Sequence, residues 1–189
     1  MNGSAYEREL RDILEGRIEQ HSKSLPKDKL KIYSLLRQKP FLVVRGAGSL
    51  GIDLIAMRGS VYLPIEVKTS KSKTIYFSDD ERLTEQLEEY KRISNKCDLP
   101  ILYARRMNGV RGEKWEFFRL DTDASRIRCW TIPDIPTTKQ GSHKLTWGQG
   151  LPLSTVIYNF FNNDLAKPSK TQFTTEYDST DKTRQNLYP

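Results

Sequence analysis

The chain has 189 residues, of which 37% are hydrophobic and 29% charged, enough for one domain with a hydrophobic core and some extension. No apolar run approaches the ~20 residues of a membrane span, and the polar first ten residues lack the apolar centre of a signal peptide. Only Cys97 and Cys129 are present, which excludes a four-cysteine zinc site and gives no sign of a disulfide framework. We therefore expect a cytoplasmic protein with no membrane association.

The formal net charge is +7, and the charge is unevenly distributed. Residues 1–50 and 101–150 each carry four more basic than acidic residues, whereas residues 51–100 carry one more acidic than basic residue. Because Lys and Arg displace counterions from phosphates, a basic chain favours an anionic partner. The alternative is a charge that only keeps the protein soluble.

The first predicted element is an amphipathic helix. Its apolar residues recur at helical spacing: Tyr6, Leu10, Ile13, Leu14 and Ile18. At ~100° per residue, Glu7 projects between two of them, on the side of the helix where a carboxylate is unfavourable. A Lys-rich stretch over 22–40 follows, with a short helix expected over 28–38.

Strands are predicted over 41–45, 52–57 and 61–68, and the short link at 58–60 indicates that the last two form a hairpin. A helix is predicted over 79–95, then strands over 100–105 and 115–120 and a sixth over 127–132. This order predicts a mixed α/β fold with one central sheet flanked by helices. We expect a core domain over 1–132 and a C-terminal extension over 133–166, docked through apolar residues 151–161. The polar tail over 167–189 is expected to be disordered.

Three charged residues interrupt the apolar strands. Asp53 lies in an otherwise apolar segment, and Glu66 and Lys68 share one face of their strand because side chains alternate. A hairpin can bring all three together, and two clustered acids suit a hard cation such as Mg²⁺. Lys68 would then orient or deprotonate a water, or steady charge on a phosphate. The alternative is a buried ion pair of Lys68 with either acid. Glu7 would be a third acid, unless it only caps its helix.

These residues resemble the archaeal Holliday junction resolvases, compact nucleases of the PD-(D/E)XK superfamily. The resemblance covers roughly residues 3–120 and rests on Gly3, Tyr-Glu-Arg-Glu-Leu (6–10), Arg-Gly-Ala-Gly-Ser (45–49), Asp-Leu-Ile-Ala (53–56) and Ile-Glu-Val-Lys (65–68). It implies a restriction-endonuclease-like core over 1–132. It also implies Asp53 and Glu66 as metal ligands, Lys68 as catalytic lysine, and Glu7 as an outer or additional ligand.

The resemblance also implies DNA contacts. Arg8, Arg45 and Ser49 would hold phosphates or the scissile strand, and Lys71 is a further expected DNA contact. Gln86-Leu-Glu-Glu-Tyr90 is similar to a motif of RecB-type nucleases, in which Gln86 would touch DNA or a metal-bound water; an ordinary helix is the alternative. Residues 22–40 look like an insertion, and 121–189 have no counterpart in the family pattern.

The predicted function is Mg²⁺-dependent resolution of four-way DNA junctions by a homodimer, near the nucleoid, with Mn²⁺ able to replace Mg²⁺. Two symmetrical cuts call for two-fold symmetry. Two alternatives remain at this point: a nuclease of the same superfamily acting on linear or damaged DNA, and a non-catalytic DNA-binding module. The sequence leaves open whether the gene is cellular or viral.

Overall fold

The computed structural model describes residues 3–46, 51–129 and 131–162. A six-stranded sheet runs through its centre. Its strands, in spatial order, are β1 (Leu42–Arg45), β2 (Leu54–Arg58), β3 (Val61–Ser70), β5 (Leu102–Met107), β6 (Trp115–Arg119) and β8 (Leu151–Pro152). A separate two-stranded ribbon consists of β4 (Thr74–Tyr76) and β7 (Lys144–Thr146).

The sheet is mixed. β3 and β5 are parallel, with Glu66 beside Tyr103 and Lys68 beside Arg105, and the other neighbours are antiparallel. The parallel pair needs a crossover, which runs through β4, the 3-10 helix η1 (Phe77–Asp79) and α3 (Glu81–Cys97). β2 and β3 form the predicted hairpin, in which Arg58 pairs with Val61 across a two-residue turn. Gly59 takes a positive φ of 59° in that turn, which a side chain would disfavour.

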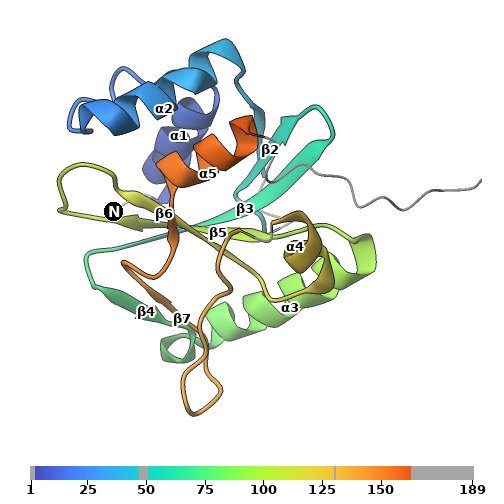
Figure 1. Ribbon diagram of the computed structural model, residues 1–189. Helices are drawn as coiled ribbons and strands as arrows, with labels where there is room; N and C mark the ends of the chain where they lie inside the picture. Colours follow the sequence, from blue (N-terminus) through green and yellow to red (C-terminus); the bar gives the residue numbers. More distant parts are fainter. Residues whose placement is uncertain (1–2, 47–50, 130, 163–189) are drawn as a thin grey trace, which may run out of the picture.

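Helices cover both faces of the sheet (Figure 1). One face carries α1 (Gly3–Leu14), α2 (Lys27–Gln38) and α5 (Leu153–Phe161), and the other carries α3 and α4 (Asp123–Arg128). Alternating strand residues supply a core to each layer: Leu102 and Ala104 face the first, whereas Ile101 and Tyr103 face the second. The predicted α/β architecture, a mixed sheet between helices, is therefore confirmed. Within the described ranges, no helix is long and apolar enough to cross a membrane.

One expected strand is wrong. Residues 127–132 were expected to form a sixth strand, but residues 123–128 form α4. Thr122 caps this helix, because its side chain accepts a hydrogen bond from the Ser125 N–H, and Asp123 lies in the first turn. The capping signal at 122–125 outweighs the short alternation that follows it. The ribbon of β4 and β7 was not expected from the sequence.

Residues beyond 132 contribute to both cores. Leu145 is buried under α3, and α5 buries an apolar stripe against the other face: Leu153, Val156, Ile157 and Phe160. The expected tail at 167–189 lies outside the described residues. The stretch at 22–40, interpreted as an insertion, contains α2, which packs Tyr33 and Leu36 into the core.

A buried carboxylate joins α2 and α5 to the β5–β6 connection. The side chain of Glu113 is 5% exposed, and Lys29 Nζ lies 2.6 Å from its Oε2. Glu113 also accepts hydrogen bonds from the Tyr33 hydroxyl at 3.1 Å, the Ser154 N–H at 2.5 Å and the Ser154 hydroxyl at 2.9 Å. Ser154 lies in the first turn of α5, where the helix dipole favours a negative charge.

We expect Glu113→Ala to lower the free energy of unfolding by about 2–4 kcal/mol, because it leaves a half-buried ammonium and several donors without their acceptor. Urea unfolding followed by circular dichroism measures the change. Glu19→Ala is the matched control, since Glu19 forms an exposed ion pair with Arg37 and its loss should leave the midpoint almost unchanged. Equal midpoints for both variants would contradict a structural role for Glu113.

Candidate active site

Asp53 directly precedes β2. Its carbonyl accepts the Gly46 N–H at 2.9 Å, and its Oδ2 accepts the Val67 N–H at 2.7 Å. Burial, together with the nearby charges of Glu66 and Glu7, raises the pKa of Asp53 to about 6, against the lowering effects of the Val67 hydrogen bond and of Lys68. The fold therefore holds Asp53 where its negative charge is unfavourable and a cation would stabilise it.

Glu66 and Lys68 lie two residues apart on β3 and face the same layer, as strand alternation predicts. Glu66 is only 4% exposed. Its Oε1 accepts a hydrogen bond from Lys68 Nζ at 2.8 Å, and its Oε2 contacts the Tyr90 hydroxyl at 2.8 Å. Lys68 Nζ also donates to Gln86 Oε1 at 2.8 Å. Two residues of α3 therefore fix the charged pair from the side opposite the strand.

Tyr90 connects α3 with the loop before Asp53. Its hydroxyl accepts a hydrogen bond from Gln86 Nε2 at 2.9 Å and contacts both Glu66 and the Gly51 carbonyl. Burial and the charge of Glu66 hold the pKa of Tyr90 far above its ordinary value, so the phenol stays protonated. One phenol has one proton, so it donates to Glu66 or to Gly51 at any moment.

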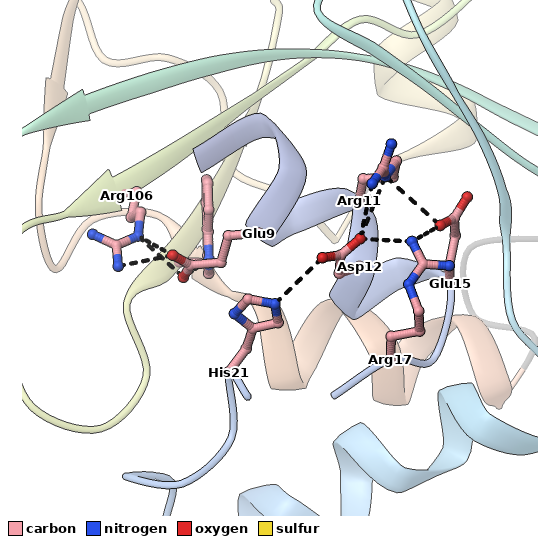
Figure 2. Close-up of polar contacts among 8 residues, drawn as sticks. Glu9, Arg11, Asp12, Glu15, Arg17, His21 and Arg106 are labelled. Atoms are coloured by element: carbon pink, nitrogen blue, oxygen red, sulfur yellow. Dashed lines mark hydrogen bonds and ion pairs between the residues drawn. The ribbon is translucent and has the colours of Figure 1, made fainter. Parts of the chain in front are cut away.

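Helix α1 brings Glu7 to the same region. Arg45 Nη2, at the end of β1, lies 2.5 Å from Glu7 Oε2. Two residues further along the helix, Glu9 points at Arg106 on β5, as Figure 2 shows; both Glu9 oxygens lie 3.1 Å from Arg106 Nε. Glu9 also accepts the indole N–H of Trp115 at 3.1 Å. These bonds on two sides of the helix fix its N-terminal half against the sheet.

A second network of charged side chains lies at the C-terminal end of α1. Figure 2 shows Asp12 between Arg11 and Arg17, with His21 on its other side. Burial acts to raise the pKa of Asp12, but hydrogen bonds from Arg17 and Arg11 outweigh it and lower that pKa. Arg17 also contacts Glu15, so it joins the last turn to the following loop. The network stabilises the helix that carries Glu7 and is remote in sequence from the other predicted ligands.

The donor set suits a divalent cation in part. Asp53 and Glu66 are close enough for the charge of Glu66 to raise the pKa of Asp53, and carboxylate oxygens are the ligands that Mg²⁺ prefers. Among the described residues, no group of three or more His, Cys, Asp and Glu side chains is arranged to hold a metal ion. Glu7, which is paired with Arg45, therefore stays a prediction as a third ligand.

The remaining predicted contacts are distributed around this pair. Arg8 is exposed on α1, Lys71 is exposed just after β3, and Gln86 is half-buried beside Lys68. Ser49 lies outside the described residues. Sequence reasoning missed Glu9 and Arg106; the available signal was two adjacent arginines inside an apolar strand, each of which needs a partner when buried.

An acid pair with a neighbouring lysine on the hairpin and central strand of a mixed sheet is the arrangement that the resemblance to PD-(D/E)XK nucleases implies. Residues 28–146 match the family model described as archaeal Holliday junction resolvase (Hjc). The chain therefore belongs to the archaeal Holliday junction resolvase family, as predicted, and is a nuclease of the class that resolves four-way DNA junctions. Nucleases of this family are metal-dependent.

The matched segment contains Asp53, Glu66 and Lys68, whereas Glu7 and Arg8 precede it. Among solved structures, the chain is similar to the Holliday junction resolvase Hjc of the archaeal hyperthermophile Archaeoglobus fulgidus. The two share 21% sequence identity with a TM-score of 0.42, over 68% of this chain and 96% of that one.

We expect Asp53→Asn to stabilise the metal-free protein at pH 8 but not at pH 4. The folded pKa of about 6 lies above the ordinary 3.8, so the unfolded chain ionises first and ionisation of Asp53 costs stability as the pH rises through this window. Discounted for partial solvent screening, the gain at pH 8 is about 1–2 kcal/mol. Urea unfolding in EDTA at both pH values measures it. A gain of the same size at pH 4 would show that the charge is not its cause.

Proposed function

We propose that the protein cuts four-way DNA junctions by Mg²⁺-dependent hydrolysis, with Asp53 and Glu66 as metal ligands and Lys68 as catalytic lysine; Mn²⁺ is expected to replace Mg²⁺. The convergence of these three side chains, inside the segment that matches the resolvase family, supports the proposal. Such a substrate would place the protein in the cytoplasm with the chromosome.

The cation would neutralise charge on the phosphate during hydrolysis. Lys68 is held by Glu66 and Gln86, so its ammonium is oriented before substrate arrives. There it can donate a hydrogen bond to a phosphate oxygen or orient the attacking water. The water oxygen bonds to phosphorus, the bond to the 3′ oxygen breaks, and a proton passes to that oxygen. The products carry a 5′ phosphate and a 3′ hydroxyl.

The exposed cations would hold the DNA. Arg8, Arg45 and Lys71 would contact phosphates, as would Ser49, and phosphate contacts of this kind set the register of a duplex. Arg45 would share its guanidinium between Glu7 and a phosphate. Gln86 has both amide atoms engaged by Lys68 and Tyr90, which favours a positioning role over the predicted DNA contact.

We propose that two copies assemble through the exposed face of strands β1, β2 and β3. Leu42 and Tyr62 are 65% and 50% exposed and flank Met57 across three paired strands; Val44, 47% exposed, lies beside them. An apolar face shared by neighbouring strands is typical of a protein–protein contact. The other predicted region, residues 151–161, turns most of its apolar side chains into the core, with Tyr158 exposed.

Cleavage of a labelled four-way junction with Mg²⁺ tests the activity. We expect Asp53→Asn, Glu66→Gln and Lys68→Met each to slow cutting about 100-fold or more while junction binding changes little, because these residues act at the reacting phosphate. Glu85→Ala, an exposed carboxylate on α3, is the control. A duplex of equal sequence reports on structure selectivity.

The alternatives give different results in the same assay. Equal cutting of junction and duplex would favour a nuclease for linear or damaged DNA. Junction binding without any Mg²⁺-dependent nick would favour a non-catalytic DNA-binding module. Full activity in one of the three variants would remove that residue from the mechanism.

We expect Val44→Lys to convert the dimer to a monomer at micromolar concentration, because it places a charge in the proposed apolar contact. Light scattering gives the mass, and supercoiled junction-bearing plasmid shows whether paired cuts become single nicks. Tyr158→Lys, an equally exposed position on α5, should leave the mass unchanged. The reverse pattern, a monomer from Tyr158→Lys and a dimer from Val44→Lys, would move the interface to residues 151–161.

A further inference from the structure

The β4–β7 ribbon lies beside the N-terminal end of α3, on the layer that faces Lys68 (Figure 1). Its paired residues are Thr74 with Thr146, Ile75 with Leu145, and Tyr76 with Lys144. Ile75 and Leu145 pack into the core under α3. Alternation therefore turns the other pairs outward, so that exposed Tyr76 stands opposite half-buried Lys144 on the neighbouring strand.

The ribbon and its loops carry charge of one sign. Residues 70–77 and 135–152 contain four lysines and no Asp or Glu: Lys71, Lys73, Lys139 and Lys144. Three of these lysines are exposed and Lys144 is half-buried. None of their ammonium groups forms an ion pair with a carboxylate in the described parts of the chain. Lysines that form no ion pair suit a polyanion.

The fold presents these lysines from a fixed backbone. Arg105, fully buried and paired in register with Lys68, donates from Nη2 to the carbonyls of Ser72 at 2.6 Å and Lys73 at 2.9 Å. The Trp147 N–H also donates to the Lys73 carbonyl, at 2.8 Å. The loop after β3 is thereby fastened to the strand next to the proposed catalytic lysine.

Helix α3, in contrast, carries charges of both signs. Its residues 81–97 include four acidic and four basic side chains, and Lys91 and Arg92 form ion pairs with Glu88 and Glu89. The helix is therefore balanced in charge, whereas the ribbon and its loops are basic. A DNA strand that reaches Lys68 would be attracted more strongly over the ribbon than over the helix.

We propose that the β4–β7 ribbon, with the loop at 70–73, binds the phosphate backbone of a DNA arm next to the site. This inference rests on DNA as the substrate, as in the proposed function. Lys71, Lys73 and Lys144 contact phosphates, and Tyr76 covers the sugar or base edge beside them. These contacts position the arm without reading its sequence.

The test compares three full-length variants by binding to a labelled four-way junction in EDTA at several salt concentrations. In the ribbon variant, Lys71, Lys73 and Lys144 become Ala; in the charge-preserving variant the same residues become Arg. In the control, three exposed lysines on and before α2, across the sheet, become Ala: Lys23, Lys27 and Lys31. Circular dichroism confirms folding.

We expect the ribbon variant to bind more weakly, with the slope of log K against log salt flatter by about one for each lost phosphate contact. The Arg variant and the control should keep wild-type affinity. With Mg²⁺ and saturating junction, the ribbon variant should keep the wild-type kcat and show a raised KM.

Equal affinity and salt slope for wild type and the ribbon variant would overturn the inference, and so would an equal loss in the control. A wild-type protein that binds junction through the ribbon but never cuts it would overturn the proposed nuclease activity and leave the ribbon contact standing. The two failures are therefore distinguishable.

Discussion

Burial of the Glu66 carboxylate is the constraint on which the site depends. A charged group that is 4% exposed requires donors, and Glu66 receives one from its own strand and one from α3. The second donor, Tyr90, also contacts the loop before Asp53, and its neighbour Gln86 holds Lys68. The contacts that pack α3 on the sheet are therefore the same contacts that orient the charged residues.

Strand β5 ties the two helical layers to this arrangement through two adjacent arginines. Alternation sends their side chains to opposite faces. Arg106 meets Glu9 and fixes α1, which carries Glu7, whereas Arg105 meets loop carbonyls and fixes the ribbon. Each guanidinium is buried and each finds oxygen acceptors, as burial of a charge demands. The strand next to Lys68 thus orients α1 on one face of the sheet and the loop at 72–73 on the other.

The elements that could be predicted from the sequence are those with a periodic pattern of apolar residues. The apolar spacing predicted α1 and α3, and the short link at 58–60 predicted the hairpin that brings Asp53 near Glu66. The β4–β7 ribbon could not be predicted from the sequence. Strands of three residues are too short to show an alternating pattern, and their pairing joins residues about 70 positions apart. The expected strand at 127–132 failed because Thr122 caps a helix there. Partners such as Arg106 for Glu9 depend on tertiary contacts that no local pattern encodes.

The two edge strands of the central sheet differ. β8 has two residues, one of which is Pro152, and proline has no N–H to offer to another strand. At the opposite side, β1 has four residues and, among the described strands, pairs only with β2. A sheet with a single open edge can accept a strand from one neighbour, and that neighbour's own open edge is occupied by the same contact. Growth by strand addition would therefore stop at a closed pair instead of continuing into a fibre.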